Sequence, residues 1–194
     1  MLDFDAVVKA PFGGIGIRID AGVVSEAVYL PASMVTRLAT RLTTRLTTGL
    51  TTGLASRLTT RLTTKPARHA LAKEAVQQIK RYWKDPSFVF DLPLAPRGTA
   101  FQQNVWRAIS AIPSGATLSY GAVARKLRSG PRAVGGACGA NWYSLIIPCH
   151  RVLAANGLGG FGEGRGENEG GFHLNIKRWL LAHEGVAGYV KPRF

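Results

Sequence analysis

The 194-residue chain is 46% hydrophobic, which is enough to build the core of one or two compact domains. Its 25 Lys and Arg against 11 Asp and Glu give a formal charge of +14, which favours a polyanionic partner such as nucleic acid. No stretch approaches the roughly 18 apolar residues of a membrane span, and the opening sequence MLDFDAVVKAPFGG lacks the pattern of a signal or transit peptide, so we expect no membrane association.

The two cysteines, Cys138 and Cys149, provide no disulfide framework and no C-x-x-C motif. This usage is typical of a reducing compartment. We therefore expect a cytoplasmic protein, associated with the nucleoid in a bacterium or located in the nucleus of a eukaryote.

Residues 4–30 predict a meander of three strands. Apolar residues alternate with small or charged ones, most clearly at Ile15, Ile17 and Ile19, and glycine-containing turns separate the three segments. The expected fold class is therefore α/β in the broad sense (α+β), and the chain begins with a small sheet.

Residues 36–64 form a four-residue repeat with leucine at every fourth position from Leu38 to Leu62. A period of four drifts about 40° per repeat around an α-helix, so the leucines form no lasting stripe, and threonine and glycine weaken the helix further. The repeat has five Arg and no acid, and is either a basic arm for DNA or a flexible insertion between a strand and a helix. We favour the insertion, because removing the repeat and Lys65 only lowers the net charge from +14 to +8.

Helical spacing of apolar residues resumes after Pro66 and continues to about Asp85, and FVFDLPL is then expected to be extended. A second helix is predicted after Thr99, which has the spacing of a capping box with Gln102. We place a domain boundary near residues 91–98. The expected organisation is an N-terminal α+β domain, 1–95, that carries the repeat, and a second domain, 96–194.

The segment SYGAVARKLRSGPRAVGGACGAN predicts two helices joined by a tight turn, a helix-turn-helix. The second helix holds Gly135, Gly136 and Gly139, each of which costs about 1 kcal/mol relative to alanine. These small residues permit either close packing between helices or close approach to a partner. The charge and the helix-turn-helix favour DNA, with Arg132 near the positive end of the helix available to a phosphate or a duplex.

The sequence IIPCHRV, residues 146–152, places Cys149 beside His150 and Arg151. A basic environment favours the thiolate, and a neighbouring histidine can act as its base. The candidate for orienting that histidine is Glu184, which lies just before the glycine that ends the helix NIKRWLLAHEG. Cys138, among small apolar residues, is expected to be a simple buried residue.

The combination of PCHRV, of RAVGGA beginning seventeen residues before Cys149, of Asn141 and of WLLAHEG resembles the O6-alkylguanine-DNA alkyltransferases over residues 96–185. The resemblance implies a small-sheet, ribonuclease H-like N-terminal domain and a mostly helical C-terminal domain. It also implies a monomeric, single-turnover methylated-DNA–protein-cysteine S-methyltransferase without a metal or other cofactor. Such a protein flips O6-alkylguanine out of duplex DNA and moves the alkyl group to its own cysteine, with O4-alkylthymine as a further candidate substrate.

The resemblance also implies roles for individual residues. Cys149 would be the alkyl acceptor, His150 the base that activates it through a bound water, and Glu184 the carboxylate that orients the histidine. Asn141 would brace the turn before the cysteine. These four residues are the predicted catalytic set.

On the DNA side, the resemblance makes Arg132 the finger that replaces the extruded nucleotide. Tyr120 would press on the 3′ phosphate and contact the flipped base. The small residues that allow the helix to approach the duplex are Ala133, Gly135 and Gly136.

The resemblance predicts a guanine pocket in which the carbonyls of Cys149 and Val152 accept hydrogen bonds from the guanine amino group. Ser144 stands where the family often has Pro or Ala, which favours a wider pocket, and Gly162 stands where a pocket-lining residue is expected. The glycine-rich loop at 163–171 is longer than usual, and we interpret it as a surface insertion rather than a lid.

Two other functions fit the same residues. A hydrolase built on Cys149, His150 and Glu184 would perform acyl transfer, and it would turn over. A DNA-binding protein without chemistry would bind equally well without Cys149 and would carry no modified cysteine.

Overall fold

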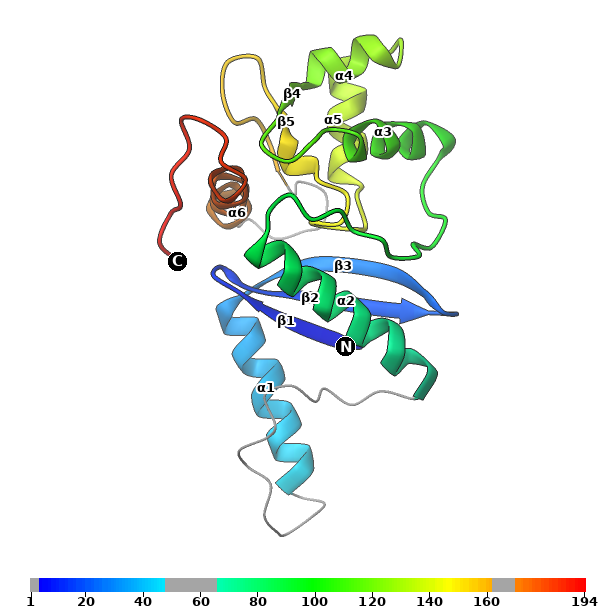
Figure 1. Cartoon of the computed structure of the whole chain (residues 1–194), viewed down its shortest axis with the longest axis vertical. Coiled ribbons are helices and arrows are strands. Elements are labelled where there is room, and N and C mark those ends of the chain that lie inside the picture. Colours follow the sequence, from blue (N-terminus) through cyan, green and yellow to red (C-terminus); the bar gives the residue numbers. More distant parts are fainter. Residues whose placement is uncertain (1–3, 48–65, 162–169) are drawn as a thin grey trace. The chain divides into compact units, whose positions relative to one another are not determined.

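The computed structural model describes residues 4–47, 66–161 and 170–194 (Figure 1). The chain divides into two compact units, one of Met1–Lys80 with Asp91–Ala95 and one of Arg81–Phe90 with Pro96–Phe194. Among the residues described, no helix has the length and apolar character needed to cross a bilayer.

The first unit contains an antiparallel sheet whose three strands follow one another in sequence order, which confirms the predicted meander. The strands are β1 (Ala6–Ala10), β2 (Gly13–Asp20) and β3 (Val23–Pro31). Ile15 and Ile17 are fully buried, as expected from their alternation with smaller residues. Gly16 lies against the ring of Phe4, where a Cβ would approach within 2.7 Å, so only glycine fits without a shift.

Helix α1 (Ala32–Thr47) follows β3 directly and includes residues 36–47 of the repeat. The hydroxyls of Thr36 and Thr40 donate to the carbonyls four residues earlier, at 3.0 and 3.1 Å. This bonding satisfies the threonine hydroxyls inside the helix. The repeat begins as a helix although its composition is unfavourable. Residues 48–64 of the repeat lie outside the described residues.

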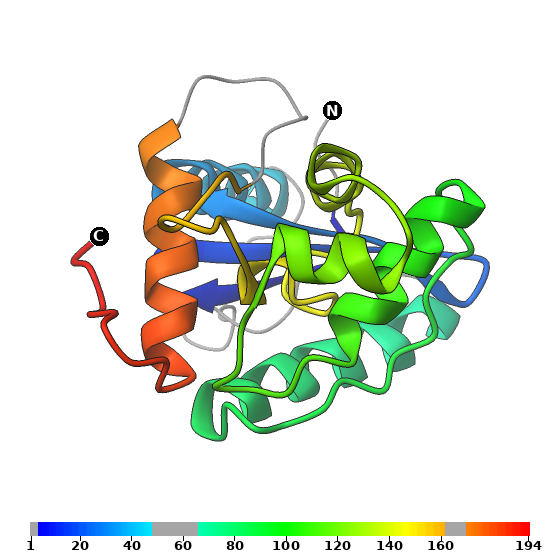
Figure 2. The same ribbon diagram turned by 90° about the horizontal axis from the view of Figure 1, so that it is seen from above.

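Helix α2 (Pro66–Lys84) has the predicted extent and runs beside the sheet (Figures 1 and 2). The amide of Gln78 donates to the Asp91 carbonyl and accepts from the Asp91 N–H, both at 2.9 Å. The next residues pair with β3, where Val24 donates to Pro93 at 2.7 Å and Ala95 donates to Val24 at 2.9 Å. The predicted extended segment is therefore confirmed, and it returns the chain to the sheet.

The second unit is mostly helical. Its helices are α3 (Ala100–Ser110), α4 (Tyr120–Lys126), α5 (Pro131–Gly139) and α6 (Gly170–His183). The predicted capping box of Thr99 and Gln102 is present, and Ser119 caps α4. Trp106 of α3 is buried and donates its indole N–H to the Ala137 carbonyl of α5 at 2.7 Å.

A short parallel pair, β4 (Leu118–Ser119) and β5 (Val152–Leu153), lies between α6 and the group formed by α3, α4 and α5 (Figures 1 and 2). Leu118 pairs with Val152, and Ser119 pairs with Leu153. Strand β4 leads directly into Tyr120 at the start of α4, whereas β5 follows the Cys149–Arg151 turn. The pairing therefore brings Tyr120 close to the segment that carries the cysteine.

Replacing Thr99 by alanine should destabilise the protein by about 1 kcal/mol, because the N–H of Gln102 loses the hydroxyl that caps α3. Chemical denaturation followed by circular dichroism measures this change. The control is Thr99→Ser, which keeps the hydroxyl and should stay close to the unmodified protein. Equal stability of all three proteins would contradict a capping role.

Candidate active site

His150 and Glu184 meet in the interior of the second unit. His150 Nε2 lies 2.8 Å from Glu184 Oε1, and the two side chains are 1% and 0% exposed. Cys149 is buried next to the histidine on a single 3₁₀ turn, η1 (Cys149–Arg151), that follows Pro148. The structure thus brings the predicted trio of Cys149, His150 and Glu184 into one buried site.

Glu184 also binds two partners that the sequence did not identify. Tyr82 donates its hydroxyl to Oε1 at 2.8 Å, and the Arg151 guanidinium donates to both carboxylate oxygens at 2.8 and 3.0 Å. The same guanidinium donates to the Ile112 carbonyl at 2.6 Å. In the sequence, the spacing of Tyr82 indicated only a core residue on a helix. It is separated from Glu184 by 102 residues, so no local pattern could reveal this contact.

The charges of this cluster follow from its burial. Burial by itself would raise the pKa of Glu184, but hydrogen bonds and charge interactions with His150 and Arg151 outweigh it and lower the pKa far below its usual range. Burial lowers the pKa of His150 more than Glu184 raises it. At neutral pH the carboxylate is therefore ionised, Arg151 is the cation that neutralises it, and the imidazole is neutral.

A neutral His150 that donates from Nε2 to an ionised Glu184 keeps the lone pair of Nδ1 available. That Nδ1 is buried and has no hydrogen-bond partner among the described residues. The histidine is thus fixed in the tautomer that can accept a proton at Nδ1.

Asn141 connects the turn before the cysteine to its thiol. Its amide Nδ2 donates to the Ile147 carbonyl at 3.0 Å and to Cys149 Sγ at 3.2 Å, whereas Oδ1 accepts from the Tyr143 N–H at 2.9 Å. Asn141 therefore lies where a residue bracing this turn is expected, and it also stabilises negative charge on sulfur.

Cys138 of α5 is only partly buried and faces Cys149, so it is not the simple core residue that we expected. Its carbonyl lies 3.9 Å from Cys149 Sγ. The hydrogen bond with the Cys138 thiol and burial raise the pKa of Cys149, while Asn141 and the charge of Lys177 lower it. The net shift is upward, so Cys149 rests as a thiol and needs a base to react.

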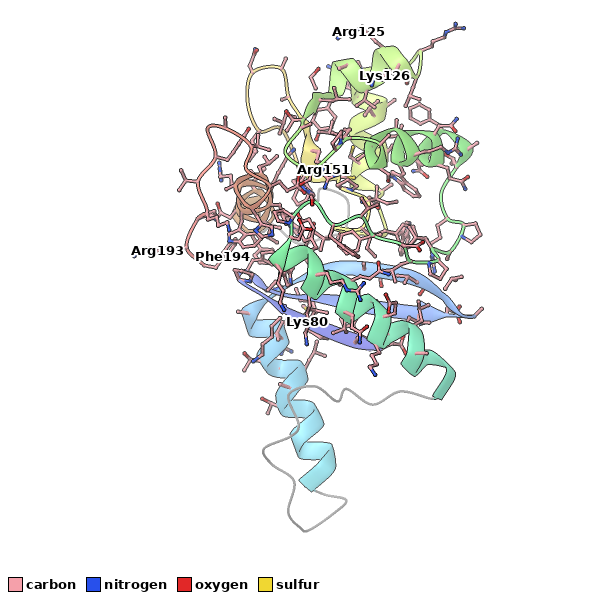
Figure 3. All side chains as sticks on the ribbon, in the orientation of Figure 1. Lys80, Arg125, Lys126, Arg151, Arg193 and Phe194 are labelled. Carbon is pink, nitrogen blue, oxygen red and sulfur yellow. The ribbon has the colours of Figure 1, made fainter. Side chains whose placement is uncertain are left out.

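The exposed start of α5 carries the predicted DNA-binding residues. Arg132, Ala133 and Gly136 are exposed, and so are Arg125 and Lys126 at the end of α4 (Figure 3). A Cβ added at Gly135 or Gly136 would meet no heavy atom within 4 Å. Close packing between helices therefore does not explain these two glycines.

The predicted pocket residues are only partly brought together. Val152 is buried on β5, and Tyr120 donates its hydroxyl to the Gly160 carbonyl at 3.0 Å. Ser144 lies half-buried on the segment before Cys149. Gly162 and residues 163–169 of the long loop lie outside the described residues.

Within residues 4–47, 66–161 and 170–194, no group of three or more His, Cys, Asp or Glu side chains could hold a metal ion. Lys177 is a buried cation that no sequence pattern indicated. In the sequence this residue is a lysine next to Ile176 in an apolar helix, and many exposed lysines occur in the same pattern.

Comparison with known proteins identifies relatives. Residues 100–186 match the sequence profile of the 6-O-methylguanine DNA methyltransferase, DNA binding domain. A methylated-DNA–protein-cysteine methyltransferase of Methanosarcina acetivorans is 41% identical over 116 residues, which cover 58% of this chain and 69% of that protein. A Mycobacterium bovis protein of the same name is 43% identical over 57% of this chain and 63% of its own length.

Solved structures resemble the chain over most of its length. A Mycobacterium tuberculosis OGT in complex with DNA superposes with a TM-score of 0.63 at 30% identity, covering 92% of this chain and 91% of the other. An O6-methylguanine-DNA methyltransferase from Pyrococcus kodakaraensis gives 0.57 at 25% identity and covers 89% and 92%. Both similarities agree with a small antiparallel sheet combined with helices.

Glu184→Gln should lower the free energy of unfolding at neutral pH by about 3 kcal/mol or more, because Arg151 would lose its buried counter-charge. The folded pKa of Glu184 lies below its unfolded value near 4.5, so its contribution is fully present above that pH and is lost on acidification. The stability difference between the two proteins should therefore shrink as the pH falls.

Urea denaturation at a series of pH values measures that difference. Glu26→Gln is the control, since it removes a carboxylate whose ion pair with Arg18 is partly exposed, and it should change stability by less than about 1 kcal/mol. A Glu184→Gln protein as stable as the control would show that the buried cluster is not held by charge.

Proposed function

The chain belongs to the family of methylated-DNA–protein-cysteine methyltransferases, and we propose that Cys149 accepts the alkyl group. The activity is alkyl transfer in the repair of DNA. The observation that carries this proposal is the buried arrangement of Cys149, His150 and Glu184 within the segment that matches the family. The substrate that fits is O6-alkylguanine in duplex DNA, with O4-alkylthymine as a further candidate.

The chemistry requires deprotonation of a buried thiol. His150 accepts the Cys149 proton at Nδ1 through a water molecule, and Glu184 stabilises the imidazolium that forms. The thiolate attacks the alkyl carbon, so an S–C bond forms as the C–O6 bond breaks. The electron pair of the broken bond stays on the guanine, which takes up a proton and becomes an ordinary base.

The acceptor is consumed by the reaction. A thioether offers water no carbonyl to attack, unlike the thioester of an acyl-enzyme, so the bond to Cys149 persists. Each molecule therefore repairs one base, and the trio serves a single turnover rather than a catalytic cycle.

The base has to leave the duplex before it can reach a buried thiol. We propose that α4, the turn at residues 127–130 and α5 act as a helix-turn-helix on DNA. Arg132 would fill the space of the extruded nucleotide, and Tyr120 would press on the neighbouring phosphate. The open space at Gly135 and Gly136 supports close approach of this helix to a groove.

We propose that residues 96–194 form the DNA-binding alkyltransferase domain and that residues 1–95 form a ribonuclease H-like domain with the repeat as an insertion. The protein would act as a monomer in the cytoplasm, or in the nucleus of a eukaryote. The charge of +14 supports binding to DNA in either place.

Mixing the protein with excess DNA that contains labelled O6-methylguanine should give a burst that ends at one methyl group per chain. Peptide mapping should place the added mass on Cys149 and leave Cys138 unmodified. Continued release of product would favour a hydrolase, and binding without transfer would favour a DNA-binding protein without chemistry. A methyl group on Cys138 would overturn the assignment of the acceptor.

Arg132→Ala should slow repair of duplex DNA by about tenfold or more and leave the reaction with free O6-benzylguanine nearly unchanged, because a free base needs no extrusion. Single-turnover rates on the two substrates measure this. Arg178→Ala, which removes an exposed charge from α6, is the control for loss of charge alone. Equal losses on both substrates would instead assign Arg132 a structural role.

A further inference from the structure

Lys177 of α6 is completely buried, with 0% of its surface exposed. A buried ammonium is costly unless hydrogen bonds replace its hydration. Its Nζ donates to the Val152 carbonyl at 2.7 Å and to the Gly160 carbonyl at 3.0 Å. The chain therefore places a positive charge inside the second unit and holds it with backbone carbonyls.

One of the two carbonyls belongs to the predicted guanine pocket, and the other contacts a residue expected to meet the flipped base. Val152 lies on β5 immediately after the cysteine turn, and the Gly160 carbonyl also accepts the hydroxyl of Tyr120 at 3.0 Å. The ammonium lies 5.7 Å from the ring centres of both Tyr120 and Phe161. One side chain thus connects α6 with β5, the Gly160 segment and the start of α4.

The contact with Val152 leaves that carbonyl able to bind substrate. A carbonyl oxygen has two lone pairs, so Val152 can accept from Lys177 and also from the amino group of a guanine. Lys177 fixes the direction of this carbonyl before the base arrives, and it needs no contact with the base itself.

The charge of Lys177 also reaches the reacting sulfur. The hydrogen bond with Cys138 and burial raise the pKa of Cys149, and the positive charge of Lys177 opposes both effects. The titratable groups that face the ammonium among the described residues are the thiols of Cys138 on α5 and Cys149 on η1, the His150 imidazole and the Tyr120 phenol. Burial lowers the pKa of Lys177 itself to about 8, although the two thiols raise it.

We propose that Lys177 is a positioning residue for alkyl transfer, whose buried ammonium ties the Val152 carbonyl to the Gly160–Tyr120 contact and supplies the positive potential at Cys149. This inference rests on the proposed function. Below a pH of about 8 the ammonium is present and holds the pocket, and above it the charge is lost.

The test uses a Cys138→Ala background, in which Cys149 is the remaining thiol, and compares Lys177 with Lys177→Met. The ultraviolet absorbance of the thiolate gives the titration of Cys149, and transfer from free O6-benzylguanine gives the rate. At pH 7, where the ammonium is present, we expect the methionine variant to have a thiolate fraction of Cys149, and with it a transfer rate, about tenfold lower. Lys84→Met, which removes an exposed lysine, should change neither quantity.

Two outcomes separate this inference from the function on which it rests. A folded Cys138→Ala protein that transfers nothing would contradict the assignment of Cys149 as the acceptor. A protein that transfers normally, and in which Lys177→Met leaves the thiolate fraction and the rate at pH 7 unchanged, would overturn the role of Lys177.

Lys177→Gln provides a second variant, because its amide keeps N–H donors for the carbonyls but carries no charge. It should retain the fold and still show the lower thiolate fraction and transfer rate at pH 7. In the Cys138→Ala protein itself, the transfer rate divided by the thiolate fraction should fall as the pH rises through about 8. A ratio that stays constant over this range contradicts the proposal even if both variants fail to fold.

Discussion

The carboxylate of Glu184 is fully buried and ionised, and a charge in that position has to be matched by donors on both oxygens. The donors come from three distant parts of the chain, at Tyr82, at His150 with Arg151, and at Gly115, whose N–H lies 3.5 Å from Oε2. The end of α2, the cysteine turn and the end of α6 are consequently held together through one side chain. The rest of the active site is arranged around this requirement.

The same cluster decides which chemistry the cysteine can perform. Burial, assisted by the charge of Arg151, keeps His150 uncharged and free to accept a proton, while Asn141 and Lys177 favour negative charge on Cys149. A thiol that stays protonated at rest, and that loses its proton to a side chain only for the transfer, suits a reaction that occurs once. An exposed thiolate would react with other electrophiles and would lose its function before meeting damaged DNA.

Local patterns in the sequence predicted the elements that depend on local physics. The alternation around Ile17, the capping box at Thr99 and the cap at Ser119 all describe interactions within a few residues. Long-range contacts had no such signal, so Tyr82 and Lys177 were not identified as parts of the site. Arg151 was expected only as a positive neighbour of Cys149 and not as a partner of Glu184. The helix over residues 36–47 was underestimated because propensity does not count tertiary packing, such as that of Val35 at the start of α1 against Gly14 of the sheet.

The glycines of α5 impose a compromise between stability and activity. Alanine would fit at Gly135 and at Gly136 without meeting another atom, and each replacement would strengthen the helix by up to about 1 kcal/mol. The fold therefore tolerates a more stable version of the helix that we propose as the recognition helix. The protein keeps the weaker version, and engineering it for thermal stability at these two positions would improve the folded chain while adding methyl groups to the surface that we propose approaches DNA.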